Sequence, residues 1–385
     1  MKIIGHYILL GVLIFITSCS SSKSVDFKIA DVKLFDGNKV TEHANIYVKK
    51  GKIVQIDSSN QTSLLKSKKI IDGKDKTLIP GLINAHCHLS SSNDLKDAAQ
   101  AGILTMIELF RMQENTIQPF RKLAEKPQYA NFYTAGMAAD MPNGVFKLYT
   151  QQINNLAPKT KKEAVQFIQD RVEQQVDFIK IIYDSRLPEK FSDSLFDALI
   201  SETHKNNLLA VVHSELLGDA DFEFDHGADI IAHGWIDGLI SDETLLKWRS
   251  REFYITPTLL IHCKAKKIHN MKSYKLTLEQ IIAEIGRLHK AGIPLLAGTD
   301  APAEGINYTT DLYEELALYV ETGLSPLEAI KTATSNPAKA YKLKNKGIIH
   351  TGLTADFVLI EGDVLSDIKR LNSINHVWKK GVQIR

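Results

Sequence analysis

Short apolar runs alternate with amphipathic helical segments from Leu82 to Lys342, over about 260 residues. Three helical segments begin with a capping-box pattern, at Thr160, Thr277 and Ser325. Continuous apolar runs suit parallel strands that are covered on both faces. The alternation therefore predicts an α/β fold, a (β/α)₈ TIM barrel, which typically takes about 250 residues. After a first strand that ends at His86, the expected strands are Gly102–Leu109, Phe178–Tyr183, Leu208–His213, Asp229–His233, Phe253–His262 and Ile293–Asp300.

The two ends of the chain follow a different pattern. Residues 27–57 alternate roughly by two, with turns between short strand-like stretches, and residues 375–384 repeat this style. Strand-rich ends around a different middle predict one small discontinuous β-sandwich domain. We expect residues 27–81 and 343–385 to form it, beside a barrel of residues 82–342.

The N-terminus carries a processing signal. Residues 7–16 form an almost unbroken apolar run, too short for the ~20 residues that span a bilayer comfortably. Small residues follow, as at the exit of a secretory signal, and then Cys19. This run into a cysteine resembles a bacterial lipobox. The resemblance implies a signal peptide at 1–18, a lipidated Cys19, a tether at 19–26, and a membrane-anchored lipoprotein of the periplasm or outer membrane. An ordinary cleaved signal or an uncleaved anchor is the alternative.

Charge and cysteine content exclude other classes. The chain has 47 Lys+Arg and 45 Asp+Glu, a formal net charge of +2, which gives no basic footprint for nucleic acid. Apart from Cys19, only Cys87 and Cys263 remain, too few for a disulfide framework. We therefore expect a small-molecule substrate and no nucleic-acid partner. The oligomeric state does not follow from the sequence.

Polar side chains recur where the apolar runs end, the place where barrels of this type carry their chemistry. Lys180 follows His86 by 94 residues, close to three βα units of about 31 residues. His213 follows after 33 residues, His233 after 20 and Asp300 after 67. This spacing predicts side chains at the ends of strands one, four, five, six and eight.

These residue types suit a divalent metal. Side chains alternate along a strand, so His86 and His88 point the same way. Imidazole nitrogens and carboxylate oxygens are ligands of Zn²⁺. A His-x-His pair alone is a weak signal, but five matching strand ends make a metal site the better interpretation. Asp300 could bind metal and also take a proton from an attacking water, as general base.

Lys180 is the most diagnostic residue. A lysine among apolar neighbours on a buried strand is costly unless it is paired. Burial lowers the lysine pKa and favours the neutral amine. A neutral amine can add CO₂ to form a carbamate, whose two oxygens could bridge two metals ~3.5–4 Å apart. A snorkelling or salt-bridged lysine is the alternative.

Together these motifs resemble the amidohydrolase superfamily, specifically the imidazolonepropionase-like group with its metal-dependent dipeptidases and carboxypeptidases. The matching segments are residues 78–88, 179–181, 232–234, 297–301, 332–338 and 347–360. The resemblance implies a binuclear site, usually Zn²⁺, with a carboxylated Lys180 as the bridge. The site residues it implies are His86, His88 and Asp300 for the more buried metal, and His213 and His233 for the second. A bridging hydroxide would attack the substrate carbonyl, and Asp300 would pass its proton to the leaving group.

The chain departs from the family at two places. Asn84 replaces the acidic residue common before the first histidine, and residues 214–217 differ from the usual small residues. Three residues are weaker candidates for substrate contacts. Tyr183 and Arg186 could contact a substrate carboxylate, the arginine through a bidentate fork, or could be an ordinary loop tyrosine and a solvated arginine. His262, at the end of a strand-like run, could face substrate or belong to the core or rim.

The sequence thus predicts a metal-dependent hydrolase that cleaves an amide bond, in a small peptide or an N-acyl amino acid. An ester or lactone hydrolase on the same site is an alternative. A mononuclear deaminase or imidazolone hydrolase fits less well, because Lys180 has no role there. A non-catalytic binding lipoprotein that keeps an inherited barrel is the alternative outside the enzymes.

Overall fold

The computed structural model describes residues 24–58, 63–111, 113–141, 144, 156–269 and 273–385. The predicted signal peptide and Cys19 lie outside the described residues, so the lipid anchor stays a prediction. Among the described residues, none of the helices is both long and apolar enough to cross a bilayer.

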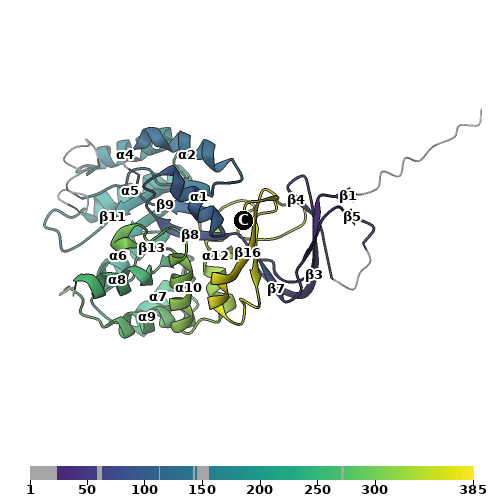
Figure 1. The fold of residues 1–385 in the computed structure, drawn as a ribbon. Helices are drawn as coiled ribbons and strands as arrows, with labels where there is room; N and C mark the ends of the chain where they lie inside the picture. The colour runs from purple at the N-terminus through teal and green to yellow at the C-terminus, as the bar shows by residue number, and fades with distance from the viewer. Residues whose placement is uncertain (1–23, 59–62, 112, 142–143, 145–155, 270–272) are drawn as a thin grey trace, which may run out of the picture.

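Two parallel sheets form the wall of the large domain (Figure 1). The first has the order β10-β9-β8 and the second the order β11-β12-β13-β14. Parallel bridges join them, at Ala139 with Ile181 on one side, and at Leu295 with Ile255 and Ala301 with Cys87 on the other. The segment around Leu295 to Ala301 therefore takes the place of an eighth strand. This is the α/β architecture of a TIM-barrel-like domain. The strands are β8 (Leu82–Cys87), β9 (Ile103–Glu108), β10 (Asn131–Thr134), β11 (Ile179–Ile182), β12 (Ala210–His213), β13 (Ile230–Ala232) and β14 (Tyr254–Thr256).

Helices cover the outside of this wall, and their starts follow the sequence signals. Thr277 and Ser325 form complete capping boxes. Thr160 accepts from the backbone N–H of Glu163, but the Glu163 carboxylate accepts from Lys159 instead, so that box is half formed. The helices are α1 (Ser92–Gln100), η1 (Glu114–Thr116), α2 (Ile117–Ala124), α4 (Lys161–Glu173), α5 (Asp193–Lys205), α6 (Leu217–Asp225), α7 (Asp242–Trp248), α8 (Leu259–His269), α9 (Leu278–Lys290), η2 (Ala303–Gly305), α10 (Asp311–Glu321), α11 (Pro326–Thr332), α12 (Ser335–Ala340) and η3 (Ile368–Ser373).

Strands from both ends of the chain meet in one sheet beside the barrel (Figure 1). Its order is β17-β16-β15-β7-β2-β3-β4, with β6 paired to β2, and β1 pairs with β5 separately. The predicted union of the two ends is thus present, but as one hydrogen-bonded sheet, and a sandwich of two sheets is not confirmed. The strands are β1 (Ser24–Val25), β2 (Phe27–Phe35), β3 (Val40–Lys49), β4 (Lys52–Ser58), β5 (Lys66–Ser67), β6 (Ile70–Asp72), β7 (Lys76–Pro80), β15 (Phe357–Glu361), β16 (Ile374–Lys379) and β17 (Val382–Gln383).

The expected strand from Phe253 to His262 is wrong in its second half. The strand β14 ends at Thr256, and α8 begins at Leu259. The buried Glu315 carboxylate of α10 accepts hydrogen bonds from the backbone N–H groups of Leu259 and Leu260, at 2.9 and 2.7 Å. These bonds satisfy backbone N–H groups that have no helical partner at the start of α8. Because the helix begins here, His262 lies on α8 and not on a strand.

Candidate metal centre

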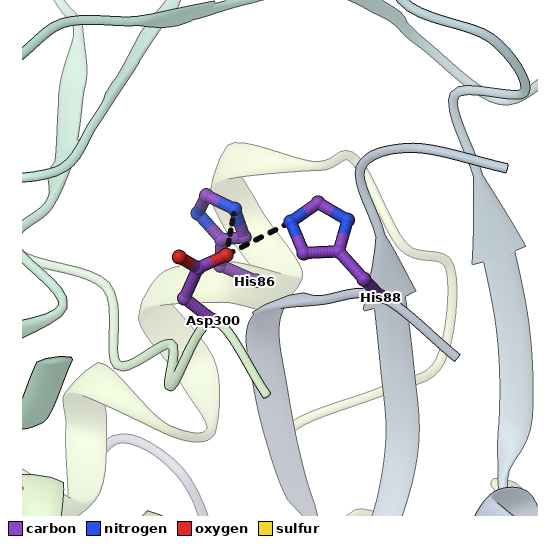
Figure 2. A group of neighbouring side chains, drawn as sticks. All are labelled: His86, His88 and Asp300. Carbon is purple, nitrogen blue, oxygen red and sulfur yellow. Dashed lines mark ion pairs between the residues drawn. The ribbon is translucent and has the colours of Figure 1, made fainter. Parts of the chain in front are cut away.

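Two histidines and an aspartate converge at one end of the barrel (Figure 2). His86 lies on β8, His88 follows that strand, and Asp300 ends the eighth strand segment. The Asp300 Oδ1 lies 3.1 Å from His86 Nε2 and 2.8 Å from His88 Nε2. The three candidate ligand atoms lie within 4.8 Å of one another. This group can hold a metal ion.

Buried polar atoms without hydrogen bonds support that interpretation. The Nδ1 atoms of His86 and His88 and the Nζ of Lys180 are buried and make no hydrogen bond, and the buried Nε2 of His86 meets Asp300 without good hydrogen-bond geometry. Buried polar groups are normally satisfied, so this concentration requires an explanation. A metal ion would use imidazole lone pairs directly, and a modified lysine would no longer be an orphan donor. The residues present therefore fit a divalent metal.

The other two predicted histidines lie against the same group. The His233 ring centroid is 4.7 Å from that of His86 and 4.5 Å from that of His213. His213 is the last residue of β12, and His233 follows β13. The four histidines thus form a continuous cluster, although the three-residue metal grouping found among the described residues contains only His86, His88 and Asp300.

Strained and close-packed backbone holds this cluster. His233 and Asp300 have positive φ values of 78° and 60°, a conformation that L-residues rarely adopt and that concentrates at functional sites. A Cβ on Gly298 would lie 2.6 Å from the Cβ of His86 and 2.7 Å from Cγ2 of Thr256. Glycine therefore lets the eighth strand segment approach β8 closely enough to bring Asp300 to the histidines.

Burial sets the protonation of the cluster. Burial lowers the pKa of His86 to about 3 and that of His213 to about 4, and it holds the pKa of His233 well below its usual value. Neutral imidazole is the form that binds metal. Burial alone would raise the pKa of Asp300, but the neighbouring His86 and His88 outweigh it and keep that pKa well below 3.8.

Burial also lowers the pKa of Lys180 to about 8, against the opposing charges of Asp300 and Glu223. The amine is thus partly neutral near neutral pH, which is the form that carbamate formation requires.

Asn84 links two strand segments through hydrogen bonds. Its side-chain N–H donates to the Thr299 hydroxyl at 2.9 Å, and its oxygen accepts from the backbone N–H groups of Thr299 and His86, each at 3.2 Å. The amide therefore links β8 to the eighth strand segment directly below the metal group. An acidic residue would lack the donor that Thr299 accepts.

Two of the predicted substrate contacts, Tyr183 and Arg186, have other partners in the structure. The Tyr183 ring packs in a core cluster, stacked on Phe222 of α6 at 4.8 Å and edge-on to Phe196 of α5 at 5.5 Å. Side chains alternate along β11, so Tyr183 points to the helix layer and Lys180 to the other face. Arg186 does not offer a free fork, because its Nε and Nη2 already bond Asp184 at 2.8 and 2.6 Å.

His262 lies in a different element from the one expected but stays a candidate. It is buried on α8, its Nδ1 pairs with the Tyr274 hydroxyl at 2.9 Å, and its Nε2 has no hydrogen-bond partner. Glu215 and Asp300 are the charged groups that act most strongly on its ring. It therefore lies near the metal group.

Glu223 was missed by sequence reasoning. It is fully buried on α6, and neither carboxylate oxygen makes a hydrogen bond of good geometry. Burial raises its pKa well above 4.5, helped by Asp219 and opposed by Lys180. Asp219 and Glu223 lie four residues apart on the same buried helix face, and the sequence signal was this acidic pair on a helix beside a predicted site strand.

Comparisons with known proteins agree with this fold. Residues 77–384 match the Amidohydrolase family. The 5-methylthioadenosine/S-adenosylhomocysteine deaminase of Thermoanaerobacter pseudethanolicus is 23% identical over 372 residues, covering 87% of this chain and 84% of that protein. The structure resembles a Xaa-Pro dipeptidase with bound methionine, at a TM-score of 0.78 and 19% identity, covering 93% of this chain and 99% of that one. It also resembles molinate hydrolase, at a TM-score of 0.77 and 20% identity, covering 94% and 95%. With a family match over most of its length, this chain belongs to the amidohydrolase family.

Proposed function

We propose that the chain is a metal-dependent hydrolase that cleaves an amide bond in a small molecule, such as a small peptide or an N-acyl amino acid. Family membership supports the coarser statement of a metal-dependent hydrolase that acts on carbon–nitrogen bonds. The observation that carries the proposal is the unpartnered Lys180 amine at the His86, His88 and Asp300 group, which favours a two-metal hydrolase over a one-metal deaminase.

The proposed site holds two divalent ions, most simply Zn²⁺. His86, His88 and Asp300 would hold one ion, and His213 and His233 would hold the other. Lys180, once carboxylated by CO₂, would supply a carboxylate ligand to the same site. Such ions polarise a carbonyl group and lower the pKa of a bound water towards neutrality.

The chain's own residues handle the proton and the geometry. Asp300 is deprotonated at neutral pH, so its carboxylate accepts the proton of the attacking water and then donates it to the leaving nitrogen. The hydrogen bond between Thr258 and His233, at 2.9 Å to Nδ1, fixes that ring and leaves Nε2 for a ligand. Burial of His86 and Lys180 excludes bulk water around them.

Deamination is the second candidate, and the names of the deaminase relatives favour it. It requires one metal ion and gives Lys180 no role. An ester or lactone hydrolase would use the same residues as the amide hydrolase, so only substrates separate these two.

The test is a substrate screen with the zinc-loaded full chain. It covers dipeptides, N-acyl amino acids, esters, lactones and aminopurine nucleosides. We expect amide hydrolysis that His86→Ala abolishes and that His350→Ala, a change at an exposed histidine, leaves intact. Ammonia release from nucleosides without amide cleavage would contradict the proposal in favour of deamination. No turnover of any class, with no bound metal, would favour a non-catalytic binding protein.

A further inference from the structure

The Arg186 guanidinium pairs with two carboxylates at the rim of the proposed site. Arg186 bonds Asp184 through Nε and Nη2, and the same Nη2 lies 2.7 Å from the Oε2 of Glu215. Two formal negative charges thus share one positive charge. The edge of Arg186 that would recognise a substrate carboxylate is occupied, so this rim does not favour an anion.

The second oxygen of Glu215 faces the metal centre. Its Oε1 lies 4.0 Å from Nε2 of His213, and the side chain keeps 40% of its surface exposed. Arg186 therefore fixes the Glu215 carboxylate while leaving one oxygen open to a ligand that approaches His213.

A buried histidine of the same site is the second observation. His262 is 3% exposed, and its Nε2 makes no hydrogen bond of good geometry. Glu215 is the charged group that acts most on its ring, and the Pro257 carbonyl acts on it more weakly. A Cβ on Gly234 would lie 3.5 Å from that Nε2, which places the nitrogen against the residue that follows His233. The Tyr274 hydroxyl holds the other ring nitrogen. A buried nitrogen fixed in this way, without a partner, indicates a ligand group that it contacts.

We propose that Glu215, with His262 Nε2 beside it, binds a protonated amine of the substrate next to the bond that is cleaved. The inference rests on the proposed function and names the charge of its substrates. An ammonium has three donors and no acceptor, so it can bond the Glu215 oxygen and, in the tautomer whose Nδ1–H donates to the Tyr274 hydroxyl, the Nε2 lone pair of His262 as well. A bond between an ammonium and a carboxylate is also stronger than a neutral one. Glu215 is then a specificity-determining residue, in the segment where this chain departs from its family.

The experiment compares two ligands that differ only in this amine. The zinc-loaded full chain is titrated in a calorimeter with an amino-acid hydroxamate that has a free α-amine, and with its N-acetylated form. Both ligands bind zinc through the hydroxamate. We expect the free amine to bind about tenfold more tightly, a difference that corresponds to about 1.4 kcal/mol. Glu215→Gln, which can still bond Arg186 through its amide oxygen, removes most of this preference.

The control is Glu252→Gln, an exposed carboxylate paired with Lys339 at 2.7 Å, which should keep the wild-type preference. Equal binding of both ligands to the wild type overturns the inference while the proposed hydrolase stands. A preference that survives Glu215→Gln also overturns it, because the amine would then be recognised elsewhere. Binding of neither ligand, with no retained zinc, contradicts the proposed function as well. Equal zinc content in Glu215→Gln and wild type shows that the variant keeps its metal centre.

Discussion

Two lysines of this chain are buried to a similar degree but differ in their hydrogen-bond partners. Lys379 of β16 is fully buried, and its Nζ donates to the backbone carbonyls of Ala124 at 2.7 Å, Lys126 at 3.4 Å and Tyr129. Lys180 of β11 is 3% exposed, and its Nζ has no hydrogen-bond partner. Lys379 belongs to the small sheet and Lys180 to the barrel wall.

The partners explain the difference. The Ala124 carbonyl at the end of α2 carries partial negative charge and lacks a helical donor. The Lys379 side chain donates to it and to the Lys126 and Tyr129 carbonyls that follow the helix, and so joins the sheet to the barrel. Lys180 receives nothing comparable from the protein, although a buried amine costs several kcal/mol without compensation. A buried lysine with three acceptors is a structural link, and one with none is poised for chemistry. The predictions below test this contrast.

The largest effect is expected at Lys180. Lys180→Ala removes the proposed bridge and with it several kcal/mol of transition-state stabilisation, or about a thousandfold in rate. Added short carboxylates such as acetate should restore part of the activity by replacing the carbamate. The measurement is kcat/KM with and without acetate, on the substrate found in the screen. Full activity of Lys180→Ala without acetate would contradict the proposed bridging role of Lys180.

The matched change at Lys379, in the small sheet, should lower the stability of the fold and leave metal binding unchanged. Lys379→Met removes the side-chain donor from the Ala124 and Tyr129 carbonyls, at a cost of about 2–3 kcal/mol in the free energy of unfolding. Urea denaturation of the zinc-free chain measures it, and the zinc content of the folded variant should equal that of wild type. Unchanged stability would show that the link between sheet and barrel lies elsewhere.

The pH dependence of stability should reveal the unpaired amine. The pKa of Lys180 is about 8 in the folded chain and 10.5 in the unfolded one, so between these values the unfolded state binds more protons. Lys180 should therefore make the free energy of unfolding of the metal-free chain rise with pH in this window, by at most about 1.4 kcal/mol per unit. Lys379, whose pKa burial lowers to about 7, adds a rise of its own that the Lys180 variant keeps. The Lys180 contribution is lost as pH falls through 8. In Lys180→Met the slope should be smaller, and an identical slope would contradict the shift.

The smallest effect is expected at Tyr183, three residues after Lys180. Tyr183 points into the helix layer, opposite to Lys180, so Tyr183→Phe keeps the ring contacts with Phe196 and Phe222. We expect kcat and KM within about twofold of wild type, since surface and packing-neutral changes stay within about 0.5 kcal/mol. A large rise in KM would restore Tyr183 as a substrate contact.

Periodicity and spacing were sufficient for the barrel-like wall and for bringing His86, His88 and Asp300 together, because strand ends of one sheet share one edge. They failed where the answer depends on contacts far apart in sequence. Arg186 pairs with Asp184, only two residues away, but its second partner Glu215 lies 29 residues away and had no local signal. The Pro257 break could have ended the strand before His262, but the capping by Glu315 from α10 had no local signal. An acidic residue such as Glu223 on a helix looks solvated until its packing is known.

Metal counting tests the central claim most directly. Zinc-loaded wild type, freed of loose metal and measured by mass spectrometry, should retain about two ions per chain, as expected of a two-metal site. Lys180→Ala should retain one or fewer, while Lys379→Met should match wild type. A single ion in wild type, or the same content in Lys180→Ala, would contradict the account and leave His86, His88 and Asp300 as a mononuclear centre.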